Sequence, residues 1–260
     1  RQDAAPTERK KTSSKAGIEN MSKRARCGCF AIALLSAILS PTASVTGAEV
    51  TVFDRVGAVG MTVTLVVRTT DFLMADGGRS VSISLDGERL GTVLTGGDGY
   101  GYFRLAPRRA GLLRVSARSG ETEASGWLLV MEETDRAVLV EVETVIKEIY
   151  LRPDARDACR MAFGSLRPRY QLFFVYRFMG ADFSRNRLEK EGLAPAVVIP
   201  WKGAATLESL REKEVQVHAV IGSAETVTAA GAQVPHRISF EKTKGAATVS
   251  DWSDIEKILE

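Results

Sequence analysis

The sequence predicts two domains of different fold class, an all-β sandwich over 49–131 and an α/β domain with a three-layer parallel sheet over 135–260. Residues 49–131 contain about seven short β-type runs that are separated by turn signals. Residues 135–260 instead alternate apolar strand-like runs with helix-like stretches, which is typical of a parallel sheet covered by helices. A length of 260 residues also suits two small domains, because most domains contain about 100–200 residues.

The segment 21–48 has the pattern of a signal peptide. Three basic residues follow Met21 closely and precede the ten-residue apolar run 30–39. A run of this length is too short to span a bilayer but is typical of the central region of a signal peptide. We place cleavage after Ala48 and expect export to the periplasm or the extracellular space, with no integral membrane segment after cleavage. Residues 1–20 are polar and rich in Lys, and we expect a disordered upstream segment there.

The net charge of +3 does not indicate a nucleic-acid-binding protein. Residues 1–48 contain 8 Lys or Arg and 3 Asp or Glu, whereas residues 49–260 contain 27 basic and 29 acidic residues. The excess of positive charge therefore belongs to the N-terminal segment and is missing from the predicted domains. We expect no nucleic-acid partner.

Cysteine and histidine are too scarce for the common metal sites. Cys27 and Cys29 precede the apolar run of the predicted signal peptide, so cleavage would leave Cys159 without a disulfide partner in the chain. The two histidines, His218 and His236, lie apart in the sequence, and His218 falls inside an apolar run. The sequence therefore predicts no zinc site.

The first domain is predicted from recurring β-type runs. The expected strands cover 50–53, 62–67, 81–85, 92–95, 101–105, 112–117 and 127–131. Asp86 and Gly87 separate two of these runs, and this dipeptide favours a tight hairpin turn in which both positions need a positive φ. Short strands in this number, without a helical period, are typical of an immunoglobulin-like sandwich.

Part of this region resembles bacterial immunoglobulin-like domains. The resemblance is carried by TGGDGYGYF at 95–103, by Pro107, and by GLLRV at 111–115, and it extends over about 80 residues. The glycine cluster lies between two expected strands and not before a helix, so it predicts a turn and no phosphate-binding loop.

Strand and helix signals alternate in the second domain. The expected strands cover 137–142, 172–176, 196–199, 217–221 and 237–240, and the expected helices cover 153–166, 184–192, 207–213, 226–232 and 253–259. The first strand is continuously apolar, as in strands that are buried on both faces of a parallel sheet. Ligands bind such sheets outside the carboxyl ends of the strands, where we therefore expect the site.

The order of these elements resembles the haloacid dehalogenase (HAD)-like hydrolase fold. The resemblance is carried by PDAR at 153–156, LRPRYQLFFVYR at 166–177, VHAVIGSAETVTAAGAQVPHRI at 217–238 and VSDW at 249–252. Phosphatases of this family have a D-x-D-x-[TV] motif after the first strand, whose first Asp attacks phosphorus and whose second acts as acid and base. A Ser or Thr ends the second strand, a Lys follows, and a G-D-x-x-x-D segment supplies magnesium ligands.

The positions at which the family places catalytic and metal-binding residues hold other residues here: Glu141, Glu143, Tyr176, Ser223 and Val227, with Lys202 as the candidate for the family lysine. Glu is one methylene longer than Asp, and a misplacement of about 1 Å lowers a rate roughly 10²-fold. Val227 has no ligand atom and Ser223 has only a neutral hydroxyl, so two anionic positions are lost. The resemblance therefore implies a HAD-like domain without its catalytic set. About 35 residues separate Glu141 from Tyr176, which leaves no room for a cap domain.

We therefore expect a non-catalytic binding or scaffold module with no cofactor and with an unknown protein, lipid or surface ligand as its partner. A first alternative is a weak or altered phosphohydrolase that uses Glu141 and Glu143, with Mg²⁺ bound by Glu141 and Glu225. Capless HAD-like proteins act on large or surface-presented substrates, so the resemblance then implies a large or lipid-linked phosphate. A second alternative is a cell-surface adhesion protein whose immunoglobulin-like domain carries the function.

Overall fold

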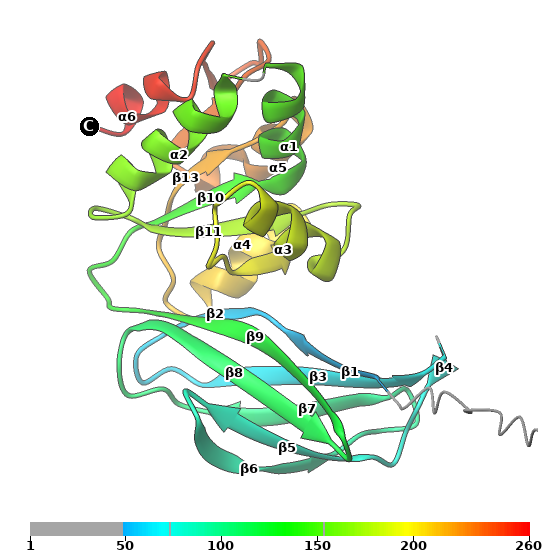
Figure 1. Cartoon of the computed structure of the whole chain (residues 1–260). Coiled ribbons are helices and arrows are strands. Elements are labelled where there is room, and N and C mark those ends of the chain that lie inside the picture. Colours follow the sequence, from blue (N-terminus) through cyan, green and yellow to red (C-terminus); the bar gives the residue numbers. More distant parts are fainter. Residues whose placement is uncertain (1–48, 73, 153) are drawn as a thin grey trace, which may run out of the picture. The chain divides into compact units, whose positions relative to one another are not determined.

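The computed structural model describes residues 49–72, 74–152 and 154–260, which form three β-sheets and six α-helices within one compact unit (Figure 1). Two sheets make up a β-rich N-terminal part and the third lies in an α/β part. The predicted signal peptide, the predicted upstream segment and Pro153, the expected first residue of a helix, lie outside the described residues.

The first sheet of the β-rich part is antiparallel and is built around β3, which pairs with three other strands. Its strands are β1 (Glu49–Phe53), β3 (Val63–Asp71), β4 (Met74–Ala75) and β7 (Tyr100–Leu105). Val63, Leu65 and Val67 are fully buried, and their spacing of two is that of a strand with one face on the core.

The second sheet has the order β2-β9-β8-β5-β6, with β2 parallel to β9 and the other pairs antiparallel. Its strands are β2 (Arg55–Ala58), β5 (Ser80–Leu85), β6 (Glu88–Leu94), β8 (Gly111–Ser119) and β9 (Thr122–Met131). Ile83, Val115 and Leu128 share one hydrophobic cluster with β1 and β3, so the two sheets form a sandwich. β2 and β4 were not expected, because four and two residues are too few for a clear alternation.

The third sheet has six parallel strands in the order β12-β11-β10-β13-β14-β15, which confirms the predicted parallel sheet. Its strands are β10 (Ala137–Glu141), β11 (Gln171–Tyr176), β12 (Val198–Pro200), β13 (Val217–Ile221), β14 (His236–Ser239) and β15 (Ala247–Thr248). The chain begins at β10, moves outward to β12, and then continues with β13 on the other side of β10. The strand order therefore reverses between β10 and β13, where crevices form in sheets of this kind.

In the described residues, five α-helices and one 3₁₀ helix connect these strands, and a sixth α-helix follows the last strand. They are α1 (Val142–Leu151), α2 (Ala155–Leu166), α3 (Ala181–Lys190), α4 (Ala204–Arg211), α5 (Ala224–Ala230), η1 (Gly231–Gln233) and α6 (Ser253–Leu259). The expected helices recur with shifts of a few residues, whereas α1 and β15 were missed. The expectation of one helix between Glu141 and Tyr176 was wrong, because α1 and α2 both lie there. α1 was not predicted because its β-branched residues Val142, Val145 and Ile149 favour β structure. They also continue the apolar pattern of the preceding strand.

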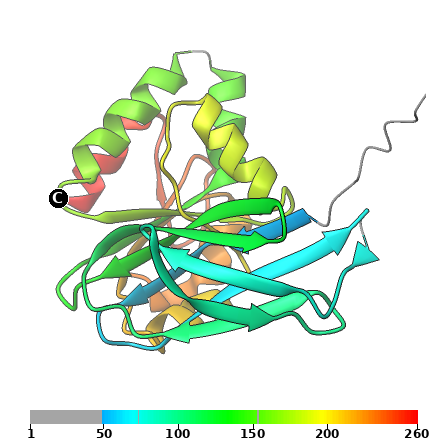
Figure 2. The ribbon, with the colours of Figure 1, turned by 60° about the horizontal axis from the view of Figure 1, so that its bottom comes forward.

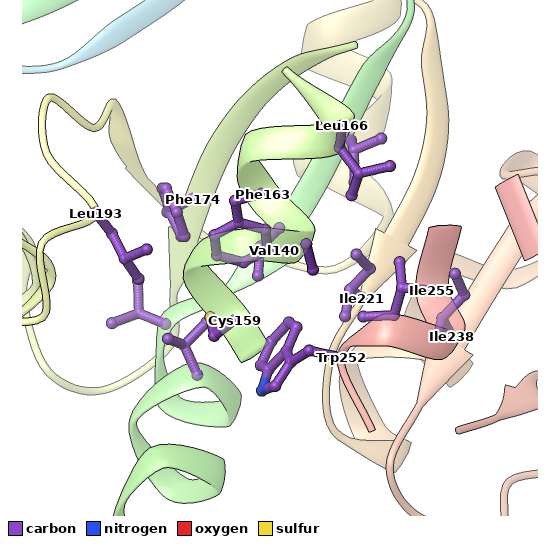
Figure 3. Packing of buried hydrophobic residues seen from close by; sticks show 14 of the residues in the cluster. Val140, Cys159, Phe163, Leu166, Phe174, Leu193, Ile221, Ile238, Trp252 and Ile255 are labelled. Atoms are coloured by element: carbon purple, nitrogen blue, oxygen red, sulfur yellow. The ribbon is translucent and has the colours of Figure 1, made fainter. Parts of the chain in front are cut away.

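One face of the parallel sheet packs against α1, α2, α3 and α6 (Figure 3). Trp252, just before α6, is fully buried, and its ring meets that of Phe163 edge to face at 5.3 Å between centroids. Val140, Ile221 and Ile238 supply the strand side of this cluster. The burial of these side chains fixes the helices over the sheet, because removing apolar area from water contributes about 25 cal/mol per Å².

The other face of the parallel sheet packs against α4, α5 and the sandwich (Figure 2). Leu139 and Phe173 from the sheet share a buried cluster with Leu207 of α4. Val56 of β2 and Leu129 of β9 belong to the same cluster. The sandwich therefore supplies part of the hydrophobic cover that this face of the parallel sheet needs.

Candidate functional site

A cavity of about 180 Å³ lies at the carboxyl end of the parallel sheet, at the reversal of strand order. It is lined by residues that follow β10, β11, β13 and β14, including Glu141, Glu143, Arg177, Ser223 and Glu241. The place is the one expected from the sequence, since the ends of neighbouring parallel strands meet at one edge of the sheet.

Glu141 is the last residue of β10 and is 1% exposed. Its Oε2 accepts hydrogen bonds from the Thr144 hydroxyl at 2.9 Å and from the backbone N–H of Ser223 at 2.5 Å. Its Oε1 accepts one from the Ser223 hydroxyl at 3.1 Å. A buried carboxylate is stable only when its charge is hydrogen-bonded or paired, and Glu141 meets this need with the chain's own donors.

Arg177, which directly follows β11, is the cation of the cavity that lies beside Glu141. Its Nη1 lies 3.7 Å from Oε1 of Glu141 and donates to the Ser223 hydroxyl at 3.4 Å. Its Nη2 forms an ion pair with Glu225, and its guanidinium lies over the Phe178 ring at 4.5 Å. These contacts hold a positive charge beside the carboxylate of Glu141. The sequence analysis did not select Arg177, although a basic residue directly after an apolar strand was the available signal.

Glu143, in the first turn of α1, orders the loop that follows β11. Its Oε1 accepts hydrogen bonds from the backbone N–H groups of Arg177, Phe178 and Met179 at 2.9, 3.0 and 3.4 Å. Its Oε2 is buried and has no hydrogen-bond partner among the described residues. Glu143 therefore sets the position of Arg177, and one of its two oxygens remains available inside the site.

The remaining predicted site residues are divided between the cavity and other places. Ser223 caps the N-terminus of α5 and lines the cavity, and Glu225 is 74% exposed at its rim. Val227 is 1% exposed in the cluster beneath α5 and contributes no chemistry to the site. Tyr176 does not line the cavity. The pKa of its phenol is raised, mainly by burial and next by the charge of Asp182.

Lys202, the candidate for the family lysine, does not line this cavity. Lys202 lines a different cavity, between the sandwich and α4. β11 and β12 are neighbours, but Lys202 follows β12 at the far edge of the sheet, two strands from β10. Sequence spacing alone does not reveal this lateral distance.

Every carboxylate that lines the cavity already has a partner in the chain. Glu141 and the rim residue Glu225 bind Arg177, and Glu143 binds backbone N–H groups. Glu148 pairs with Arg152 at 2.6 Å, and Glu241 pairs with Lys147. The hydrogen bond to Glu241 is the main cause that raises the pKa of Lys147. Across 49–72, 74–152 and 154–260, no group of three His, Cys, Asp or Glu residues is arranged to hold a metal ion.

The two histidines are neighbours in space, contrary to the expectation from their sequence separation. His218 on β13 and His236 on β14 have ring centroids 4.6 Å apart, and Tyr170 stacks on His218 at 5.4 Å. They lie at the starts of their strands, at the edge of the sheet opposite the cavity. Burial, followed by the charge of His236, lowers the pKa of His218.

Comparison with known proteins gives only a partial likeness. No family model matches the chain, and no curated protein matches it. Solved structures that match include fibronectin(III)-like modules of CbhA from Clostridium thermocellum, with 14% identity over 32% of this chain and 98% of that chain and a TM-score of 0.25. The IG27 protein domain matches with 19% identity over 33% of this chain and 95% of that chain and a TM-score of 0.28.

A third match is the C-terminal 282-residue fragment of intimin in complex with the intimin-binding domain of its translocated receptor. It has 19% identity over 34% of this chain and 33% of that chain and a TM-score of 0.25. Each of these three structures covers about a third of this chain. Among the helices of the described residues, none has the length and apolar character needed to cross a membrane.

Proposed function

We propose that the α/β part is a capless HAD-like domain without catalytic activity, and that the chain is an exported binding or scaffold protein. The observation that carries this proposal is the position of Arg177. Its guanidinium contacts Glu141 and Ser223, which occupy positions where the HAD-like resemblance places the nucleophile and a magnesium-binding Asp. A fixed positive charge there neutralises the carboxylate and disfavours a bound cation.

The strand order supports the same proposal. The HAD-like resemblance places its site after the first strand and after the strand that carries G-D-x-x-x-D. In this chain those strands are β10 and β13, which pair directly, and their ends bring Glu141 to Ser223. The contact between Glu141 and Ser223 supports the proposed likeness to a HAD-like site, and Arg177 already pairs with the carboxylate of Glu141. Such a domain keeps a stable surface for binding, whereas phosphoryl transfer needs a free nucleophile and a correctly placed Mg²⁺.

A thermal-shift titration of the purified chain with Mg²⁺ and beryllium fluoride tests this proposal. Together these probes mimic a phosphorylated carboxylate. We expect no rise in Tm beyond that produced by MgCl₂ or NaF alone. A ligand selective for the folded state at a hundredfold excess over its Kd would instead stabilise it by about 2.7 kcal/mol.

A weak phosphohydrolase is the second candidate, because Oε2 of Glu143 is buried beside the cavity without a hydrogen-bond partner among the described residues. This candidate predicts a rise in Tm that is lost in Glu141→Gln and kept in Glu208→Gln. Glu208 is a matched control, because it is exposed on α4 and lies outside the cavity. That result would contradict the non-catalytic proposal.

Export is part of the proposal and has its own test. Expression of the chain in a bacterial host should yield a secreted or periplasmic product whose first residue is Glu49. N-terminal sequencing of the mature protein measures this directly. A product that retains residues 30–39 would contradict the proposed cleavage after Ala48.

A further inference from the structure

A larger cavity of about 550 Å³ lies between the sandwich and the α/β part. On the sandwich side it is lined by β2, β3 and β7, with Thr64 of β3 and Tyr102 of β7 among the lining residues. On the other side it is lined by the end of β12 and by α4, including Ile199 and Ser209. Its volume is in the range of small-molecule sites, about 300–1,000 Å³.

Three basic side chains line this cavity, and none of its lining residues in the described part of the chain is acidic. Arg55 comes from β2, Lys202 follows β12, and Lys213 lies just beyond the end of α4. Three segments that are far apart in the sequence thus each supply one positive charge. Such a one-signed wall attracts anions, and its field is strengthened because part of its surface is buried.

The guanidinium of Arg55 is not neutralised by a carboxylate at close range. Its Nε donates to the carbonyl oxygen of Thr64 at 3.1 Å, and its Nη1 donates to the backbone carbonyl of Asp54 at 3.0 Å. Its Nη2 has no acceptor among the described residues. The carboxylate of the adjacent Asp54 instead accepts hydrogen bonds from the N–H groups of Trp127 and Val198. Arg55 therefore keeps one donor group for a ligand, while the charge of the adjacent Asp54 acts on its guanidinium.

Burial and mutual repulsion both act on the basic side chains of this cavity. Burial is the main cause that lowers the pKa of Arg55 and of Lys213. The charge of Arg55 is the next cause for Lys213, so the two cations act on each other. Holding like charges in a partly buried place is unfavourable, and an anion between them relieves that cost.

The rest of the lining adds polar and apolar groups. Tyr102 and Ser209 supply hydroxyl groups, which donate hydrogen bonds to phosphate or carboxylate oxygens. Val56, Ile199 and Leu210 form an apolar part of the wall. A few polar groups in a mainly apolar lining are the common composition of a small-molecule site.

We propose that this cavity binds a small organic anion that carries phosphate or carboxylate groups, held by Arg55, Lys202 and Lys213. The site lies apart from the Glu141 cavity, so the proposal does not depend on whether the HAD-like site is catalytic. Both proposals are tested with different ligands and variants, and either can fail alone.

Isothermal titration of the purified chain with pyrophosphate, and separately with citrate, tests the site. We expect saturable binding of at least one of these anions with one site per chain, weakened by added NaCl. The double substitution Lys202→Ala and Lys213→Met should weaken it by roughly tenfold per removed charge. The stronger of the two probes then identifies phosphate or carboxylate as the preferred group.

The control is the double substitution Lys242→Ala and Lys244→Ala, which removes the same net charge from residues that do not line this cavity. Binding should be unchanged in this variant. Lys202→Glu alone adds a safeguard, because Lys202 is exposed and its reversal should weaken binding while the Tm stays within a few degrees. No binding of either anion, or equal loss in both double variants, would overturn the proposal.

Discussion

The Nε atom of Arg185, on α3, lies 3.5 Å from Oδ2 of Asp54, which joins β1 to β2. The ion pair connects a helix of the α/β part to the sandwich, and both side chains are largely buried, with 19% and 0% exposed. Arg185 also donates hydrogen bonds to the carbonyl oxygens of Val52 at 3.0 Å and Ser125 at 3.1 Å. Burial raises the pKa of Asp54, while the charge of Arg185 acts in the opposite direction.

Asp54→Ala should strongly destabilise the protein. The carboxylate accepts hydrogen bonds from the backbone N–H groups of Trp127 and Val198, both at 2.8 Å, so its removal leaves these two donors without an acceptor and Arg185 without its buried carboxylate partner. Breaking a buried ion pair in this way costs about 3–5 kcal/mol. Urea unfolding of both proteins measures the difference. Asp182→Ala is the control, because Asp182 is an exposed partner of Arg185 and its loss should cost about 0.5 kcal/mol or less.

Arg177→Met should destabilise the protein by about 2 kcal/mol, because it leaves the buried carboxylate of Glu141 without its cation. The free energy of unfolding in urea measures this loss. Mg²⁺ should recover part of it in the variant and none in the wild type, since only the variant leaves Glu141 and Glu225 without the charge of Arg177. Glu225→Gln removes the exposed partner and should change stability by about 0.5 kcal/mol at most. Equal stability of Arg177→Met and wild type would refute the structural role of this cation.

Two glycine-to-alanine substitutions should have opposite signs. A Cβ at Gly222 would lie 2.7 Å from Oε2 of Glu141 and 2.9 Å from Cγ2 of Thr226, so Gly222→Ala should cost roughly 1–3 kcal/mol. Gly164 lies in α2, and a Cβ there meets no atom within 4 Å. Gly164→Ala should therefore stabilise the protein by about 1 kcal/mol through helix propensity. Thermal unfolding of both variants checks the pair, and a neutral Gly222→Ala would disprove the tight packing around Glu141.

Stability should fall as the pH decreases below about 6.5 because of His218. The pKa of His218 is lowered in the folded protein. At a pH between that lowered pKa and about 6.5, the unfolded chain therefore binds a proton at His218 and the folded chain does not. The contribution of neutral His218 to the free energy of unfolding is fully present above about pH 6.5 and is lost as the pH falls toward the folded-state pKa. His218→Phe keeps a ring against Tyr170 and should flatten the dependence. The free energy of unfolding from about pH 5 to pH 7.5 measures the slope, and identical slopes would contradict this assignment.

The sequence analysis located the edge of the sheet that carries the candidate site but only part of its content. Glu141 and Ser223 were selected because the HAD-like resemblance places its motif residues at these two positions, and the pairing of β10 with β13 brings them together. Arg177 was missed because its role depends on the direction of its side chain. Lys202 lines a different cavity, because spacing in the sequence does not give lateral distance in a sheet. α1 was missed because its β-branched residues favour a strand. Packing against the sheet outweighs this local preference.

The sequence by itself determined the local structure: the apolar run of β10, the alternating strands of the sandwich and the helical period of α2 follow from the sterics and burial of neighbouring residues. Only the tertiary structure decided which distant residues meet. It placed Arg185 on Asp54, His218 beside His236, and Arg55 close to Lys213, each from segments of different elements. The physical reason is that charge pairing and cavity lining depend on how the sheets and helices pack, and a pattern of near neighbours in the chain contains no information about that distance.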